Sequence, residues 1–247
     1  MENGEWISGK VTLKMFGEPV EMEMTVPAKP VKMSRMLPIF QAMTSSFAGV
    51  GEAAAAARGE EISCKKGCGA CCRQAVPLME IEVYQIRDLV ENMPEPRRSE
   101  IKRRFAEAFN YFVENGWFEK MSHFNEMTIQ EGLKTVMEYF YEGVPCPFLE
   151  DESCSIHLER PLICREYLVT SPAENCANPT PATIERAELP IKISPVILRF
   201  NRFGRFVPLI AALEFAEQFS EDETEKNGME WMQEFFARLI EQKQAKQ

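Results

Sequence analysis

The chain has 247 residues, a length that suits one large domain or two small ones. Apolar residues make up 45% and charged residues 27%, which allows a sizeable core, and an ordinary content of 13 glycines and 16 prolines excludes collagen-like and broadly disordered chains. Acidic residues outnumber basic ones by 38 to 28, and the net charge of -10 disfavours nucleic acid as a partner.

The sequence gives no sign of a membrane span or of export. No apolar run approaches the roughly 18 residues that a spanning helix needs. The first ten residues do not combine a basic stretch with a following apolar stretch, as a secretory signal would. We therefore expect a cytoplasmic protein.

The N-terminal segment, residues 1–62, is expected to form a β-hairpin and a connection. Apolar and polar residues alternate over Val11–Met15 and again over Val20–Val26, which is typical of strands with one buried face. A turn is expected at residues 17–19. The alanine-rich stretch Arg35–Arg58 favours a helix by propensity, and a mobile tether is the alternative.

Three helices are expected in the middle of the chain. Apolar residues recur at helical spacing after Pro77 as far as Val90, then over Ile101–Phe112 and over Leu133–Phe140. Asn115–Gly116 and Gly143 are expected to end the second and third helices.

The C-terminal segment, residues 181–247, is expected to pack on this middle part. We predict a strand over Ile191–Phe206 and helices over Val207–Phe219 and Met229–Gln242. The strand is expected to join the N-terminal hairpin in one small sheet. The predicted fold class is α+β and predominantly helical, with a β-hairpin and helices around a loop-rich cysteine metal-binding module.

Eight cysteines fall into two groups. The first group is Cys64, Cys68, Cys71 and Cys72; the second, in a turn-rich segment that runs from Pro145 to Pro181, is Cys146, Cys154, Cys164 and Cys176. In a reducing compartment, clustered thiols bind metal or carry out redox chemistry more often than they form disulfides. Zinc and iron–sulfur sites commonly use four thiolates, so eight could complete two sites or surround one polynuclear centre. Spacing does not choose between these.

The residues around the first group favour thiolate ligands. Gly67 and Gly69 tolerate the positive φ that a tight loop needs. Lys65, Lys66 and Arg73 add positive potential, which is expected to lower the pKa of the nearby thiols.

Other interpretations of the cysteines remain open. They could be small apolar core residues, or they could form disulfides, including a strained Cys71–Cys72 bond. A purely structural zinc site is a stronger alternative. The spacing of Cys64, Cys68 and Cys71 also matches the cluster motif of radical S-adenosylmethionine enzymes, but the alternating strands and helices of their barrel are missing.

The cysteine segments resemble a known family. CKKGCGACCRQAVPL followed by CPFLEDESCSIHLERPLICREY is similar to the YkgJ-type cysteine-cluster family, whose shared region is described as a zinc- or iron-chelating domain. The resemblance covers Ser63 to Cys176. It implies a metal-binding domain, which we expect over residues 63–180 with all eight cysteines as ligands. By their charge, Arg160 and Arg165 could offset thiolate charge, and surface ion pairs with Glu159 or Glu166 are the alternative.

Three functions follow as hypotheses. The first is a metal-binding protein that holds zinc or an iron–sulfur cluster and is redox-linked, with an electron donor as partner and iron–sulfur oxidoreductase activity left open. The second is a structural-zinc module that binds another protein. The third, a metal-dependent protein-modifying enzyme, rests on the related cysteine region of a flagellin lysine methylase. No other catalytic motif is present, and His157, three residues after Cys154, is a weaker candidate ligand.

Overall fold

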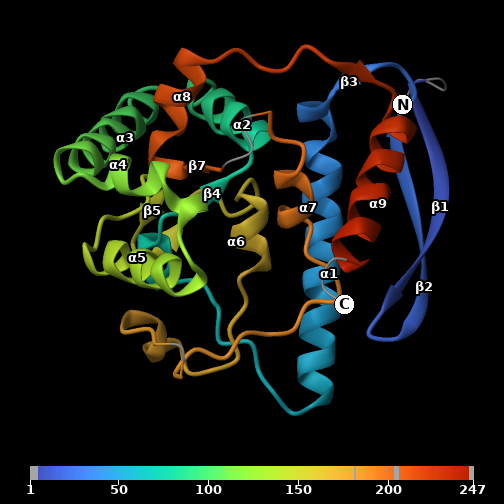
Figure 1. Cartoon of the computed structure of the whole chain (residues 1–247), viewed down its shortest axis with the longest axis horizontal. Coiled ribbons are helices and arrows are strands. Elements are labelled where there is room, and N and C mark those ends of the chain that lie inside the picture. The colour runs from blue at the N-terminus through green and yellow to red at the C-terminus, as the bar shows by residue number, and fades with distance from the viewer. Residues whose placement is uncertain (1–4, 181, 203–205, 245–247) are drawn as a thin grey trace.

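A computed structural model gives the fold and describes residues 5–180, 182–202 and 206–244 (Figure 1). The described residues form a predominantly helical α+β fold, which confirms the predicted class. The α-helices, in chain order, are α1 (Leu37–Ala57), α2 (Glu80–Glu91), α3 (Arg97–Glu114), α4 (Trp117–Ser122), α5 (Ile129–Tyr141), α6 (Leu162–Glu166), α7 (Ser194–Leu198), α8 (Ala212–Gln218) and α9 (Gly228–Gln244).

The strands are mostly short and pair two by two. They are β1 (Trp6–Met15), β2 (Glu18–Pro27), β3 (Val31–Lys32), β4 (Pro77–Leu78), β5 (Leu149–Glu150), β6 (Ser153–Cys154), β7 (Val207–Pro208) and β8 (Glu225–Lys226). The antiparallel pairs are β1–β2, β3–β8, β4–β7 and β5–β6. Short 3-10 helices are η1 (Met33–Met36), η2 (Ala70–Arg73), η3 (Phe124–Glu126), η4 (Ala173–Ala177) and η5 (Leu209–Ala211).

The predicted hairpin is confirmed, but its turn lies one residue earlier than expected. Met15 pairs with Glu18, so only Phe16 and Gly17 connect the strands, and both have positive φ, 49° and 95°. This is the geometry of the two-residue turn that matches the twist of a hairpin. Met15 and Val26 are buried on the inner face, as the alternation predicted.

The predicted strand over Ile191–Phe206 is wrong. This segment contains α7, and within the described residues the hairpin pairs with no third strand; residues 203–205, like Pro181 at the end of the turn-rich segment, lie outside the described part. Pro195 explains the difference, because proline cannot donate to a strand ladder but fits the first turn of a helix. Glu166 also accepts hydrogen bonds from the backbone nitrogens of Ile193 (2.5 Å) and Ser194 (3.0 Å) at the start of α7.

The other helix predictions hold with shifted starts. α1, α3, α5 and α9 cover the predicted stretches, and Gly116 and Gly143 take positive φ at helix ends. α2 begins at Glu80 because Pro77 and Leu78 pair with β7. The predicted helix over Val207–Phe219 therefore begins as strand β7, passes through η5, and becomes α-helical only as α8.

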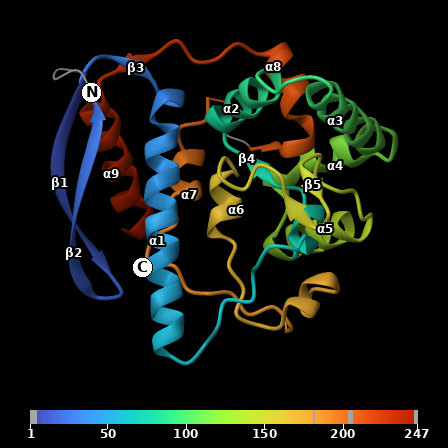
Figure 2. The same ribbon diagram turned by 180° about the vertical axis from the view of Figure 1, so that it is seen from behind.

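Helix α1 runs between two halves of the molecule (Figures 1 and 2). On one side lie α9 and the hairpin; on the other lie α2 to α6 and α8. A core joins α1 to α9, where the rings of Phe40 and Phe235 are 5.3 Å apart. A second core lies between α2, α3 and α8, and Phe105 and Phe148 meet edge to face within it. No helix in the described part of the chain combines the length and apolar character that crossing a bilayer requires.

Candidate metal centre

The first cysteine group lies in the tight loop between α1 and β4. The backbone nitrogen of Cys68 donates to the Lys65 carbonyl (3.0 Å), and Gly67 takes a positive φ of 89°, as the sequence predicted. Gly69 does not use the positive φ that glycine tolerates, since its φ is -96°. Gly69 is instead held in close packing: a Cβ there would lie 2.7 Å from Leu149 Cδ1 and from Glu152 Oε2.

The second group is carried by three separate elements. Cys146 precedes the β5–β6 hairpin and Cys154 ends it, Cys164 lies in α6, and Cys176 lies in η4. The hairpin is fixed to α3, because Arg97 and Arg104 both donate to Glu150 Oε1, at 3.0 and 3.2 Å. Rigid neighbours therefore hold the backbone that presents these thiols.

Three contacts bring the two groups together. The backbone nitrogen of Cys146 donates to the carbonyl of Cys72 over 2.7 Å. Arg73 makes a two-pronged ion pair with Glu152 in the β5–β6 turn, at 2.6 and 3.0 Å. The hydroxyl of Ser63 donates to the carbonyl of Ser171 (2.6 Å), which ties the start of the first loop to the approach to η4. Segments about 75 to 110 residues apart thus meet around one loop.

Cys71 lies at the middle of this arrangement. Its pKa is raised chiefly by a hydrogen bond with the Cys72 side chain and next by burial. Burial is the main cause that raises the pKa of five further cysteines, and negative charge on Cys71 raises each of them as well; these are Cys64, Cys146, Cys154, Cys164 and Cys176. Electrostatic contact of this kind requires short distances. Cys71 therefore neighbours thiols from both groups.

The thiols that interact electrostatically with Cys71 separate into two sets. Cys146, Cys154 and Cys164 pack against the second core, and burial raises the pKa of Cys146 to about 12. The other set is Cys64, Cys68 and Cys176: burial raises the pKa of Cys176 to about 11, and charge on Cys68 and Cys64 raises it further. Cys176 therefore joins the first group in space, although it belongs to the second in sequence.

Arg160 lies near several thiols and has one N–H group, at Nε, that makes no hydrogen bond among the described residues. Its Nε is buried and has no hydrogen-bond partner among the described residues. The positive charge of Arg160 lowers the pKa of Cys64, Cys71 and Cys154, although burial and other causes have the larger, opposite effect. A buried, unpaired N–H is costly, and thiolate or sulfide is an acceptor of matching charge. This observation fits a negatively charged metal–thiolate centre beside Arg160.

The thiols are neighbours but are not yet arranged as a chelate. All eight cysteines are free, so the disulfide interpretation has no support in the structure. Within the described residues, no three His, Cys, Asp or Glu side chains form a group ready to hold a metal ion. Neutral thiols do not need to converge, whereas a metal that displaces their protons draws them together. Binding therefore requires side-chain rotation around a backbone that is already in place.

The expected lowering of the thiol pKa values by basic residues is wrong. Where a cysteine pKa is shifted it is raised; burial is the largest cause at Cys64, Cys154 and Cys164, and the hydrogen bond with Cys72 is the largest at Cys71. Arg73, which follows Cys72 in the sequence, forms an ion pair with Glu152. Metal binding by these thiols must therefore release protons.

Two residues that sequence reasoning missed hold Cys164 in place. Glu82 is fully buried and accepts hydrogen bonds from the backbone nitrogens of Leu162 (2.7 Å) and Met79 (2.8 Å), which fixes the start of α6 to α2. Glu166 anchors the other end of α6 to α7. Burial raises the pKa of both carboxyls, that of Glu82 to about 7. A lone Glu in an amphipathic helix gives no sequence signal of such burial.

Arg165, unlike Arg160, has hydrogen-bond partners for its guanidinium. Arg165 is buried and donates to the carbonyls of Leu158 and Arg160 and to the hydroxyl of Ser45, so it braces α6 against α1 and forms no ion pair with Glu166. His157 is exposed.

The structure thus defines a helical α+β protein with a cysteine-rich loop module at the junction of its elements. Residues 63–183 match the family model CxxCxxCC, described as "Putative zinc- or iron-chelating domain". The match confirms the resemblance seen in the cysteine motifs of this segment. Metal binding is the property that the description gives. No curated protein and no solved structure matches the chain.

Proposed function

We propose that residues 63–180 bind zinc or an iron–sulfur cluster and that all eight cysteines serve as ligands. The observation that carries the proposal is the meeting of two distant cysteine groups around Cys71, beside the unpaired Nε of Arg160. Four thiolates satisfy a zinc ion or a cubane cluster, so two sets of thiols suit two centres or one larger centre.

The spatial sets suggest how the ligands divide. One centre would use Cys64, Cys68 and Cys176 with one of the adjacent cysteines Cys71 and Cys72. The other would use Cys146, Cys154 and Cys164 with the remaining one. Cys71 and Cys72 lie between the sets and can serve either, or can bridge a single polynuclear centre.

The two metals have different consequences for function. Zinc carries no redox chemistry, so a zinc form would stabilise the loop module and any protein surface it presents. An iron–sulfur cluster would add electron transfer, and the protein would then need an electron donor or acceptor. Arg160 would offset thiolate charge in either case and would raise the reduction potential of a cluster.

Anaerobic purification without added metal, followed by elemental analysis and an absorption spectrum, tests the proposal. Stoichiometric zinc, or iron with inorganic sulfide, is expected in the unmodified protein. Cys71→Ser should lose at least one metal equivalent, whereas Lys66→Ala, in the same loop but at an exposed position, should keep full loading. Metal-free protein after both zinc-rich and iron-rich growth, or unchanged loading in Cys71→Ser, would contradict it.

Arg160→Met provides a second test that keeps all eight thiols. Removal of the guanidinium takes away the charge that compensates thiolate, so metal affinity should fall by about tenfold, or about 1.4 kcal/mol. In an iron–sulfur form the reduction potential should also fall. Arg160→Lys should recover most of both effects, because it restores the charge. Equal effects in the two variants would show that Arg160 acts through packing instead.

A further inference from the structure

The turn between β5 and β6 has a strained backbone. Glu150 pairs with Ser153, so only Asp151 and Glu152 connect the two strands, and both have positive φ, 47° and 54°. Asparagine and glycine are the residues that such a turn favours, because most side chains are strained at positive φ. The β1–β2 hairpin makes the same kind of turn with a glycine, Gly17, in the second position. Glu152 takes that position in β5–β6, so the turn itself does not account for this residue.

The side chain of Glu152 holds the first cysteine loop. Its carboxylate accepts two hydrogen bonds from the Arg73 guanidinium, at 2.6 and 3.0 Å. Nη1 of Arg73 also donates to the carbonyl of Gly69 over 3.0 Å, and Gly69 lies between Cys68 and Cys71. Glu152 therefore acts on the conformation of the loop through Arg73.

The next residue of the hairpin holds the loop at a second point. The backbone nitrogen of Gly67 donates to the hydroxyl of Ser153 over 3.1 Å. Ser153 follows Glu152 and directly precedes Cys154, a thiol of the other spatial set. Two successive residues before Cys154 thus contact the loop that carries the first cysteine group. These contacts set the position of Cys154 relative to that loop.

The ion pair itself stabilises the fold too little to account for the strain. The Arg73 side chain is 30% exposed and that of Glu152 is 51% exposed. Ion pairs at such positions contribute little to folding stability, because water screens the charges and both side chains lose freedom. A left-handed backbone at a residue other than glycine has a cost at least as large. The arrangement therefore suits the placement of the loop better than the stability of the fold.

We propose that Glu152 is a positioning residue of the metal centre. Its strained backbone directs the carboxylate to Arg73, and the pair holds the first cysteine loop in register with Cys154, so that thiols of both groups reach the metal. The inference rests on the proposed metal-binding function. It adds that the residue which favours metal binding disfavours the turn that carries it.

The variant Glu152→Gly tests the proposal in the full-length protein, because glycine relaxes the turn and removes the carboxylate together. Reduced, metal-free protein is titrated with Co²⁺, whose visible absorption reports thiolate ligation and tetrahedral geometry. Co²⁺ affinity should fall by about tenfold, the lower end of the effect of residues that orient metal ligands. The spectrum at saturation should also lose tetrahedral intensity. The melting temperature of the metal-free protein should stay within about 2 °C of that of the unmodified protein.

Asp151→Gly is the matched control within the turn. It relaxes a positive φ in the same way, but Asp151 is exposed, and only its backbone carbonyl accepts a hydrogen bond, from Ser153 (3.4 Å), among the described residues. Its Co²⁺ affinity and spectrum should therefore match those of the unmodified protein, with less than about a twofold change in Kd.

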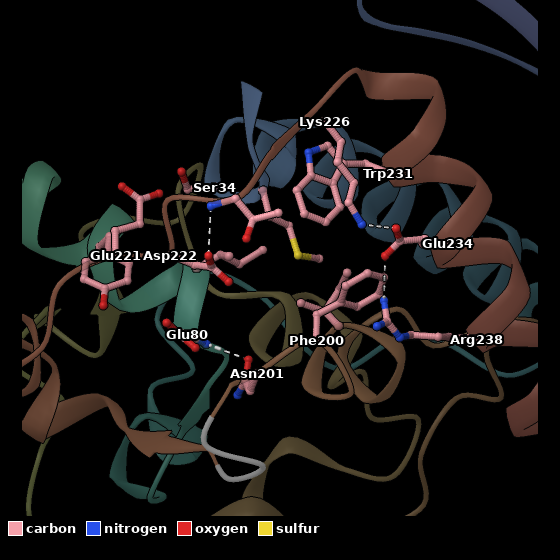
Figure 3. A pocket seen from close by; sticks show the side chains of 15 residues that line it. Ser34, Glu80, Phe200, Asn201, Glu221, Asp222, Lys226, Trp231, Glu234 and Arg238 are labelled. Carbon is pink, nitrogen blue, oxygen red and sulfur yellow. Dashed lines mark hydrogen bonds and ion pairs between the residues drawn. The ribbon is translucent and has the colours of Figure 1, made fainter. Parts of the chain in front are cut away.

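A second control removes an ion pair in another part of the molecule. Figure 3 shows Glu234 between Lys226 and Arg238, both of which pair with it, beside a cavity of about 180 Å³ that none of the eight cysteines lines. The Glu234 side chain is 37% exposed, a value between those of Arg73 and Glu152. Glu234→Gln should change Co²⁺ affinity less than about twofold.

Arg73→Met tests the other partner of the pair. It should weaken Co²⁺ binding as much as Glu152→Gly does, and the double variant should bind no more weakly than either single variant, because the two residues act as one unit. Additive losses in the double variant would overturn the proposal.

Three further results would also overturn it: unchanged affinity in Glu152→Gly, an equal loss in Asp151→Gly, or a lower melting temperature of metal-free Glu152→Gly, which would show that the pair serves the fold. Absence of Co²⁺ binding in the unmodified protein would refute the metal centre and this inference with it. Tight binding by both the unmodified protein and Glu152→Gly would refute this inference alone.

Discussion

Replacing Glu82 by Gln should change stability little at pH 5 and should stabilise the protein at pH 8. The Glu82 carboxyl is fully buried, and burial raises its pKa from 4.5 to about 7. The folded protein therefore holds a proton on Glu82 that the unfolded chain has lost. Because the pKa is raised on folding, the stabilisation is fully present below pH 4.5 and is lost as the pH rises through about 7.

The size of the effect follows from the shift. At roughly 1.4 kcal/mol per pKa unit, the free energy of unfolding falls by about 3 kcal/mol across this range. Glutamine does not titrate, but its amide can accept from only one of the two backbone nitrogens, of Met79 and Leu162, that Glu82 serves. That loss costs about 1 kcal/mol. At pH 5 about 1 kcal/mol of the Glu82 stabilisation is already lost, so Glu82→Gln should be nearly as stable as the unmodified protein there, and about 2 kcal/mol more stable at pH 8.

Urea unfolding at several pH values, with both proteins in the same metal state, measures this difference. Glu131→Gln is the matched control, because Glu131 accepts from the Thr128 backbone nitrogen (2.8 Å) at the start of α5 but is exposed. A hydrogen bond from the Thr128 side chain lowers the pKa of Glu131, so its titration lies below pH 4.5 and its effect should stay constant from pH 5 to 8. Parallel stability curves for Glu82→Gln and the unmodified protein would refute the argument.

Three further predictions concern the loop and the core. Chelation of the metal should lower the melting temperature, since a site assembled by folding contributes its binding free energy to stability; an unchanged melting curve after complete metal removal would count against this. Gly69→Ala should lower the free energy of unfolding by about 1–3 kcal/mol, because the new Cβ would lie 2.7 Å from Leu149 Cδ1. Metal loading should fall in Gly69→Ala and stay unchanged in Gly59→Ala, where nothing lies within 4 Å of the added Cβ. Phe40→Ala should cost about 3–5 kcal/mol in denaturant unfolding, since its ring packs fully buried against Phe235; a cost under about 1 kcal/mol would show that the core refills the space.

Sequence periodicity predicted those strands and helices whose formation depends on residues close together in the chain. The alternation over the hairpin and the apolar stripe of α9 each identify one buried face, and the structure buries those faces. The turn lies one residue earlier than the sequence predicts because Phe16 takes a positive φ, a conformation that an aromatic residue does not signal in sequence. The segment after Ile191 is helical although its apolar residues fit both periods, and Pro195 is the residue that discriminates between helix and strand.

Tertiary placement of the cysteines could not be predicted in the same way. Intervals of seven, nine and eleven residues do not say which thiols converge. Cys176 joins Cys64 and Cys68 only because η4 folds back onto the first loop, where Ser63 and Ser171 connect the two. The unpaired Nε of Arg160 likewise depends on contacts from distant segments.

The position of α6 suggests why a metal matters to the fold. This helix has only five residues, too short to be stable alone, yet it links both cores: Leu162 is buried in the core with α1 and α9, and Cys164 packs against the core of α2, α3 and α8. Glu82 and Glu166 hold its ends at the cost of two buried carboxyls. A metal bound by Cys164 and its neighbours would fix α6 from the loop side as well. Loading the centre should therefore stabilise the contact between the two cores, beyond ordering the cysteine loops themselves.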